Sequence, residues 1–205
     1  MANLLSDVSS AGKAGNVAYL TREALESLGL RRLGRNVRVS DRAALYDIDR
    51  ISIGDNSRID DFTVVAGEVT IGRNVHVTVF CNLAGGRAGV TLSDFSTLAY
   101  GCHVVAQTDD YSGRTMANST VPARFKQETG AHVRIGRHAI LGTGCIVLPG
   151  VHIQDGVAGG AGSVFVRSTE PWSIYTGVPA RRTGSRATDL LELEAAYLAQ
   201  SDPFR

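Results

Sequence analysis

Cysteine, tryptophan and net charge are all scarce in this chain of 205 residues. The three cysteines, Cys81, Cys102 and Cys145, form no CxxC pair and no disulfide framework of the secreted type. The formal net charge is only +1, and nucleic-acid binding usually needs a basic footprint, so we expect no nucleic-acid partner. No apolar run is long enough for a membrane span, and the N-terminus lacks a signal peptide's apolar core. We therefore expect a cytoplasmic protein.

Glycine, in contrast, is abundant, with 23 residues, whereas aromatic residues make up only 6% of the chain. Small residues in such number suit tight, repeated turns better than a helical bundle. The length is enough for one domain with its own core.

An aliphatic residue recurs at nearly every sixth position through the middle of the sequence. The column comprises Leu33, Val39, Leu45, Ile53, Ile59, Val65, Ile71, Val77, Leu83, Leu92, Leu98, Val104, Ile135, Leu141, Val147, Ile153, Gly159 and Phe165. Four residues after most of these positions stands a small or β-branched residue, and the three cysteines belong to this second column. Gly159 interrupts the aliphatic column, so we expect a local weakness or a close backbone approach there.

A period of six fits neither an amphipathic helix nor a simple half-buried strand. It fits short strands joined by tight corners, which is the hexapeptide class of parallel β-helix. Eighteen inward positions predict about six coils of three sides, with the cysteines buried as small hydrophobic residues. At a strand spacing of ~4.8 Å the prism would be roughly 30 Å long.

The ends of the chain do not follow the period and read as short helices. We expect an N-terminal helical segment over residues 1–30, with a helix capped by Thr21, and a C-terminal segment with an amphipathic helix over 173–205. The β-helix would fill residues 31–172. Its rhythm breaks after Val104, and Ile135 follows 31 positions later where six would be expected. An insertion of this length, with a loop over 106–132, is usually functional or disordered.

The sequence of residues 133–183, and above all "EPWSIYTGVPARR", resembles the C-terminal half of the hexapeptide-repeat acyltransferases. The resemblance is to the galactoside, xenobiotic and surface-polysaccharide sugar acetyltransferases. The stretch "TDDYSGRTMANSTVP" is similar to a subgroup that acts on amino sugars and O-antigens. The resemblance implies a left-handed β-helix, acetyl-CoA as cosubstrate, no metal, and a homotrimer with active sites between neighbouring subunits.

The resemblance also assigns roles to individual residues. The backbone N–H of Thr143, in "ILGTG", matches the group that contacts the thioester carbonyl, where an aimed donor stabilises developing negative charge. Gly142, Gly160 and Ala161 match small positions along the pantetheine arm, and Arg167 and Arg181 match cations near the nucleotide phosphates. Asn82 and Asp94 match polar positions that line the acceptor site.

One departure from the family concerns the base. The family usually carries a catalytic histidine where this chain has Asp109. His76 and His103 each precede an inward aliphatic residue and should point outward, so either could act as the base or be a plain surface residue. We expect Asp109 to hold an amine acceptor, with Asp110 and Tyr111 in the acceptor site and His76 or His103 at most auxiliary.

The sequence is compatible with three functions. The leading one is acetyl transfer to a nucleotide-linked amino sugar of bacterial surface-polysaccharide biosynthesis, with transfer to a sugar or small-molecule hydroxyl as the alternative. Zinc carbonic anhydrases share the repeat, but this chain lacks their closely spaced histidine pair near His103. A non-catalytic scaffold would leave the long insertion unexplained. The sequence leaves open which of Asp109, His76 and His103 is the base.

Overall fold

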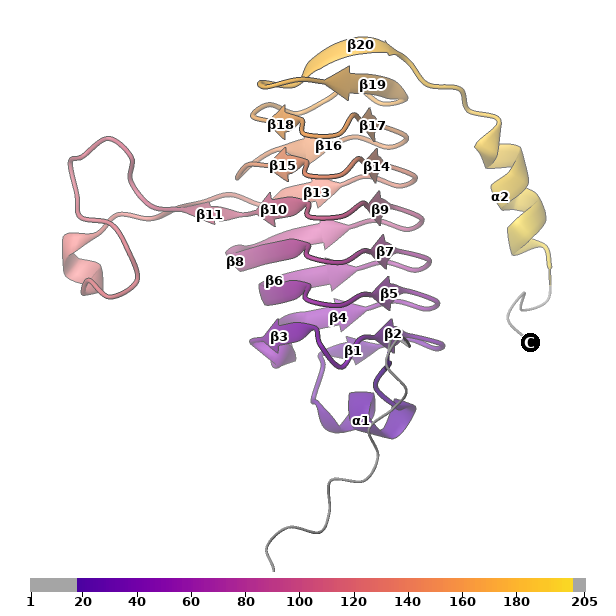
Figure 1. Ribbon diagram of the computed structural model, residues 1–205, viewed down its shortest axis with the longest axis horizontal. Helices are drawn as coiled ribbons and strands as arrows, with labels where there is room; N and C mark the ends of the chain where they lie inside the picture. The colour runs from indigo at the N-terminus through magenta and orange to yellow at the C-terminus, as the bar shows by residue number, and fades with distance from the viewer. Residues whose placement is uncertain (1–17, 201–205) are drawn as a thin grey trace, which may run out of the picture.

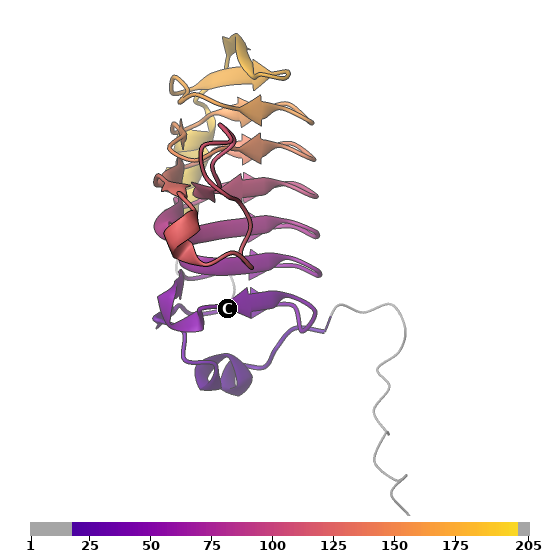
Figure 2. The ribbon, with the colours of Figure 1, turned by 90° about the vertical axis from the view of Figure 1, so that its left-hand side faces the viewer.

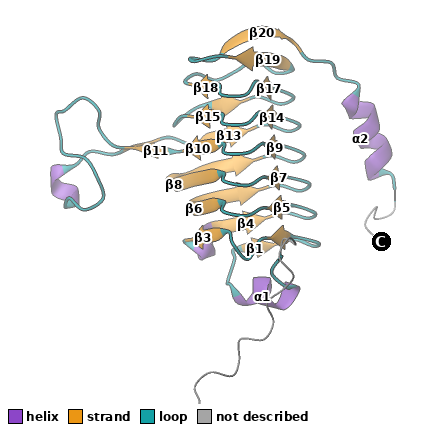
Figure 3. Cartoon of the chain, viewed as in Figure 1, coloured by secondary structure: helices purple, strands orange, loops and turns teal. Residues whose placement is uncertain are grey.

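The computed structural model of the protein describes residues 18–200 and is a left-handed parallel β-helix with a triangular cross-section (Figures 1 and 3). The chain runs upward in about seven turns. Each turn has three faces, which we number in the order in which the chain visits them after β2. A long arm leaves the prism on one side, and a helix lies along the opposite side (Figure 1).

Strands stack in register on each face. Face 1 holds β2 (Arg38–Val39), β5 (Arg58–Ile59), β7 (His76–Val77), β9 (Thr97–Leu98), β14 (Ile140–Leu141), β17 (Ala158–Gly159) and β19 (Ser173–Thr176), with β20 (Arg181–Ser185) antiparallel to β19. Face 2 holds β3 (Ala44–Tyr46), the first halves of β6 (Val64–Ile71) and β8 (Asn82–Leu92), β10 (His103–Val105), β15 (Ile146–Val147) and β18 (Val164–Phe165). Face 3 holds β1 (Arg32–Leu33), β4 (Ile51–Ile53), the second halves of β6 and β8, β13 (Val133–Ile135) and β16 (His152–Ile153). Face 1 therefore has seven parallel strands rather than the six coils expected, because β19 continues it beyond residue 172.

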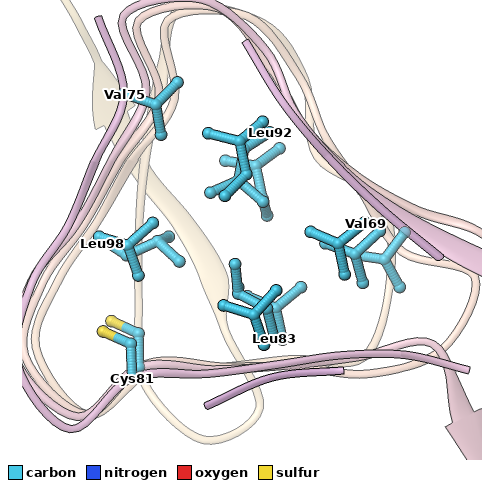
Figure 4. Packing of buried hydrophobic residues seen from close by; sticks show 14 of the residues in the cluster. Val69, Val75, Cys81, Leu83, Leu92 and Leu98 are labelled. Carbon is cyan, nitrogen blue, oxygen red and sulfur yellow. The ribbon is translucent and has the colours of Figure 1, made fainter. Parts of the chain in front are cut away.

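The core is the aliphatic column of the sequence. Figure 4 shows side chains from all three faces, among them Val69, Leu83 and Leu98, pointing into the same triangular space. All three are fully buried, as are Ile59 and Leu141 in coils below and above. Each coil thus buries its apolar side chains against the next, so stability is close to a sum of neighbour contacts.

The small column has a second role besides filling space. Thr63 Oγ1 donates a hydrogen bond to the carbonyl of Thr78 in the next coil (2.8 Å). Cys81 Sγ bonds in the same way to the carbonyl of Ala99 (3.3 Å), and Cys102 Sγ to that of Gly142 (3.2 Å). A buried carbonyl without a partner is costly. The prediction that the cysteines are buried in the stack is confirmed, and their thiols also satisfy corner carbonyls.

Gly159 stands where the aliphatic column fails, and the structure shows a close approach rather than a gap. A Cβ at this position would lie 2.9 Å from the Leu141 side chain and 2.9 Å from the Phe165 ring. Phe165 is itself almost fully buried. One large ring therefore fills the space that two aliphatic side chains share elsewhere.

Both ends carry the expected helices. Helix α1 (Arg22–Ser27) begins at Thr21, whose side chain accepts a hydrogen bond from Ala24 N–H (3.2 Å), as predicted. Helix α2 (Leu190–Leu198) lies against the corner between faces 3 and 1, where Tyr197 Oη accepts a hydrogen bond from Asn74 (2.8 Å). Within residues 18–200, no helix is long and apolar enough to cross a membrane. The first helical residues expected before position 18 lie outside the described residues.

Candidate active site

The insertion forms an arm, residues 106–132, that leaves the prism where face 2 turns into face 3. Its stem is the antiparallel pair β11 (Gln107–Thr108) and β12 (Thr129–Gly130), and its far end carries a short 3₁₀ helix, η2 (Ala123–Phe125). The arm projects away from its own chain instead of folding back over it (Figures 1 and 2). The arm therefore extends the surface of the protein well beyond the prism.

The two adjacent aspartates of the arm have different surroundings. The Asp110 carboxylate accepts hydrogen bonds from the N–H groups of Ser112 (2.8 Å) and Thr115 (3.1 Å) and from the Thr115 hydroxyl. These hydrogen bonds lower the pKa of Asp110 to about 2. Within residues 18–200, the Asp109 carboxylate accepts only one hydrogen bond, a long one from Asn118 N–H (3.3 Å). Asp110 therefore folds the arm, and Asp109 is the carboxylate with acceptor capacity to spare.

Asp109 also lines a groove at the root of the arm. The groove has a volume of about 590 Å³ and runs between the arm and the glycine-rich middle of β6 and β8. Its walls include Gly67, Gly86 and the arm residue Tyr111. Tyr111 is 91% exposed, so its ring does not hold the arm against its own prism. Asp110 is not among the lining residues. Of the three arm residues expected in the acceptor site, the structure thus gathers Asp109 and Tyr111.

Thr143 lies on a different edge, the corner between faces 1 and 2. Residues 142–145 form a turn in which Cys145 N–H bonds back to the Gly142 carbonyl (3.2 Å) and Gly144 has φ +71°. These features define a type II turn with Thr143 at its second position. Within the part of the chain that the structure describes, the Thr143 N–H makes no hydrogen bond. It is a rigid, outward donor of the kind that a developing oxyanion requires.

The corner one coil higher repeats this geometry at Ala161, whose N–H is likewise unbonded within residues 18–200. Glycines serve two purposes at these turns. A Cβ at Gly142 would lie 2.8 Å from the Ala161 nitrogen, and one at Gly160 would lie 2.8 Å from Thr176 Cγ2, so these two glycines let the next coil pack closely. A Cβ at Gly144 or Gly162 would meet no atom within 4 Å. The outer side of the corner is therefore open to an extended ligand arm, and the residues expected to contact pantetheine stand together.

Asn82 and His103 are neighbours on face 2. They are register partners in β8 and β10, with His103 exposed and Asn82 half-buried, and both point outward. Face 2 lies between the corner that carries Thr143 and the corner that carries the arm. Within one chain, Asp109 and Thr143 thus sit on opposite edges of this face.

His76 is on face 1, and its partner is a residue that the sequence analysis missed. His76 Nε2 lies 2.8 Å from Asp60 Oδ2, and Arg58 Nε donates to Asp60 Oδ1 (2.5 Å). Burial of Asp60 raises its pKa, but the hydrogen bonds from Arg58 and His76 outweigh this, and the pKa lies below its usual value. The sequence did contain a signal for Asp60. It is a carboxylate two residues after Arg58, in a column where the other coils have small residues.

Asp94 lies away from these groups. It sits at the corner between faces 3 and 1, where its Oδ1 accepts the N–H of Arg73 (2.9 Å). The next residue, Phe95, packs edge-on against Tyr197 of α2 (6.0 Å between ring centroids). The same aspartate-to-N–H bond recurs at Asp55 and Asp155 in other coils of this corner. The position predicted for the acceptor site therefore has a turn-stabilising contact, and one chain does not bring it to Asn82.

The two arginines expected near the cofactor's phosphates lie at the C-terminal end of the prism. Arg167 follows β18, and Arg181 begins β20. Both are exposed, and neither forms an ion pair within residues 18–200. In that same stretch, no group of three His, Cys, Asp or Glu side chains is close enough to hold a metal ion.

Comparisons with known proteins fit this arrangement. The chain is 37% identical over 184 residues to the dTDP-4-amino-4,6-dideoxy-D-glucose acyltransferase of Escherichia coli, covering 88% of this chain and 95% of that one. The solved structure of AntD, an N-acyltransferase from Bacillus cereus in complex with dTDP and 3-hydroxybutyryl-CoA, superposes with a TM-score of 0.87 at 37% identity, covering 89% and 97% of the two chains. A maltose O-acetyltransferase from Clostridium difficile shares the fold alone, with a TM-score of 0.52 at 20% identity. No protein-family model matches the chain.

An arm, an open glycine-lined corner and a parallel β-helix define a class, the acyltransferases that use a CoA thioester. Within that class, the chain belongs to the hexapeptide-repeat acyltransferase family, as its resemblance to the sugar acetyltransferases implied.

Proposed function

We propose that the protein transfers an acyl group from acyl-CoA to the amine of a dTDP-linked amino-dideoxy sugar. The observation that carries this proposal is the full-length similarity to the E. coli enzyme, whose acceptor is such a sugar. A mutant of AntD has also been solved with dTDP-4-amino-4,6-dideoxyglucose and coenzyme A. The groove beside Asp109 supports an amine acceptor, because a carboxylate with free acceptor capacity can hold an ammonium group.

The chemistry needs little from the protein beyond positioning. A neutral amine attacks the thioester carbonyl, the C–N bond forms, the C–S bond breaks, and the CoA thiolate can accept the proton that the amine loses. Asp109 orients the amine and accepts or passes on its proton. Thr143 N–H donates to the carbonyl oxygen as negative charge builds on it. Three further polar residues have at most an auxiliary role in this reaction: Asn82, His103 and His76.

We place each active site between two subunits of a homotrimer. Asp109 and Thr143 lie on opposite edges of face 2 in one chain, and the arm projects outward. An arm that reaches over a neighbour's corner brings the two residues together, whereas a single chain does not. A closed ring of three identical head-to-tail contacts would give three equivalent sites.

The acceptor is tested by release of CoA thiol with dTDP-4-amino-4,6-dideoxyglucose and, as a matched control, dTDP-6-deoxyglucose, which has a hydroxyl in place of the amine. Acetyl-CoA and 3-hydroxybutyryl-CoA serve as donors. We expect turnover with the amino sugar only. Turnover with dTDP-6-deoxyglucose at a similar rate would make hydroxyl transfer the function, and no turnover with either sugar would remove the proposal.

The shared site is tested by mixing two inactive variants, Asp109→Asn and Thr143→Pro. If subunits exchange at random, about a quarter of the grooves combine an intact arm with an intact corner, so activity returns. Activity that stays absent in mixed trimers, or a 21.7 kDa monomer by sedimentation, would contradict a shared site.

Both substrates are charged and do not cross membranes, so we place the reaction in the cytoplasm, as a step in making surface polysaccharide.

A further inference from the structure

Three successive coils at the N-terminal end of the prism carry a chemical pattern that the later coils lack. The pattern is asparagine, any residue, then a basic residue, in "NVR" (36–38), "NSR" (56–58) and "NVH" (74–76). The equivalent triplets in the next coils are "FST", "HAI" and "GVA". Asparagine suits the left-handed backbone of this corner, whereas neither the backbone nor the inward column fixes the basic residue two positions later.

The structure stacks the three basic side chains in register on face 1. Arg38 pairs with Arg58 in the parallel sheet, and Arg58 with His76. The three asparagines stack beside them at the corner between faces 3 and 1, each in the left-handed conformation, and Asn36 Nδ2 donates to Asn56 Oδ1 (3.1 Å). We call these six residues the amide–cation ladder. Between its two rails lies a groove of about 220 Å³, lined by all six residues with Ser57 and Val75.

The ladder is held so that its donors face outward. Asp60, whose side chain is 7% exposed, binds Arg58 through Nε and His76 through Nε2. Tyr19 donates its hydroxyl to the same carboxylate (3.3 Å), and the Arg58 guanidinium lies over the Tyr19 ring. The terminal Nη groups of Arg58 and the Nδ1 of His76 make no hydrogen bond within residues 18–200. Arg38 is exposed and has no ion pair in the same stretch.

These groups suit a phosphorylated ligand. Arg58 is held in place through Nε with its two Nη groups available as donors, and Arg38 and the asparagine amides provide further donors at the same groove. The buried Asp60 does not repel such a ligand strongly, because its ion pair with Arg58 neutralises its charge. At 220 Å³ the groove is smaller than a pocket for a whole small molecule, which is ~300 Å³ or more. It is suited to part of a ligand.

We propose that the amide–cation ladder binds the diphosphate of the nucleotide-sugar acceptor; this inference rests on the proposed function. The residues assigned to CoA stand at the edge of the same face, in the upper coils. His76 is in register with Thr97, and Thr97 with Ile140, so Thr143 lies two coils higher and three residues further round the coil. These offsets are ~10 Å along the prism axis and up to ~10 Å around the coil. The side chains of the ladder, one pyranose ring and its amine can together span them. The diphosphate would then anchor at the ladder while the amine reaches the thioester.

CoA also carries a diphosphate, so the test measures both ligands. Isothermal titration calorimetry is run with dTDP and, separately, with CoA against the full-length protein and three variants: Arg58→Gln, Arg38→Gln and Arg32→Gln. Arg32 is the matched control, because it is an exposed arginine in the same coil as Arg38 but on face 3. Circular dichroism establishes that each variant is folded. Arg38→Gln keeps the test decisive if Arg58→Gln loses its contact with Asp60 and unfolds.

We expect the Kd for dTDP to rise about tenfold or more in Arg38→Gln and Arg58→Gln, the loss typical of one charge-assisted hydrogen bond. The Kd for CoA should stay within twofold, and Arg32→Gln should match the wild type with both ligands. Unchanged dTDP binding in the ladder variants would overturn the inference and leave the proposed function standing. Loss of CoA binding in place of dTDP binding would assign the ladder to the donor. Failure of the wild type to bind dTDP would overturn the inference and the acceptor together.

Discussion

The two ends of face 1 share one backbone and differ in nearly every outward side chain. The N-terminal coils present Arg38, Arg58 and His76, whereas the C-terminal coils present Ile140 and Ala158 in the same column. Strand pairing and inward packing are the same at both ends. The period of six fixes what points inward, and the outward positions are free to specialise. One face can therefore hold two chemically unlike halves of a reaction.

The corner between faces 1 and 2 shows the same division. Phe62 and Phe80 occupy its left-handed turn position in the lower coils, with φ 58° and 60°, whereas Gly144 and Gly162 occupy it above. The two rings stack at 5.2 Å and are at least half exposed. A bulky residue in this conformation costs roughly 1–2 kcal/mol, and glycine does not. The upper corner leaves its backbone open to a ligand, and the lower corner covers it with rings.

Thr143→Pro should have the largest effect on activity. It should abolish the function assigned to the C-terminal coils and leave dTDP binding by the N-terminal coils intact. Proline lacks the N–H assigned to the thioester oxygen, and loss of one such donor costs about 10²–10³ in kcat. The fold should tolerate it, because Pro149 already occupies the second position of an equivalent turn, in which Val151 N–H bonds to the Leu148 carbonyl. The measurement is steady-state kcat, with dTDP binding as the reference for an intact lower half. A folded variant with full activity would rule out this donor.

Asp109→Asn should lower kcat/KM about a hundredfold with the amine acceptor, because in the proposed reaction the carboxylate orients the amine and takes part in its proton transfer. His76→Asn and His103→Asn, measured beside it, should lose less. If either histidine variant loses a hundredfold and Asp109→Asn does not, that histidine is the base and a hydroxyl acceptor becomes the better hypothesis.

Ala161→Gln should weaken CoA binding about tenfold and leave dTDP binding unchanged. The side chain is exposed at a turn, so a longer one fits the fold but enters the path assigned to pantetheine. Val79→Gln, at the same turn position two coils below Thr143, is the matched control and should retain CoA affinity. If the two substitutions lowered CoA affinity equally, CoA binding would not be confined to the C-terminal coils.

Asp110→Ala should have the smallest effect, a rise in KM of about threefold with kcat unchanged, because it loosens the arm without removing a reacting group. Amide hydrogen exchange should increase over residues 112–115. The Asp110 pKa is about 2, below the usual 3.8. Its contribution to the stability of the folded arm is therefore complete above pH 3.8 and is lost as the pH falls through about 2. A large fall in kcat would place Asp110 among the reacting groups.

Most of the fold could be predicted because the hexapeptide period leaves few alternatives. The inward column, the buried cysteines and the Thr21 cap appear where the sequence placed them. The additional coil at β19 was missed because Ser173–Thr176 departs from the aliphatic pattern. Asp60 was missed since its importance comes from Arg58 and His76, which reach it from its own strand and the next coil.

The sequence by itself determined which side chains point into the prism, because a period of six repeats every contact between coils and each contact is short-range. It also marked the arm, since an interruption of a regular repeat is visible without coordinates. Only the tertiary structure decided which carboxylates already accept hydrogen bonds from backbone N–H groups. The sequence does not distinguish Asp94 and Asp110 from Asp109 as candidate site residues. In the structure, Asp94 stabilises a corner and Asp110 stabilises the arm, each by accepting hydrogen bonds from backbone N–H groups. The availability of a polar group depends on the donors that the fold places around it, and these come from turns and neighbouring coils that the repeat does not specify.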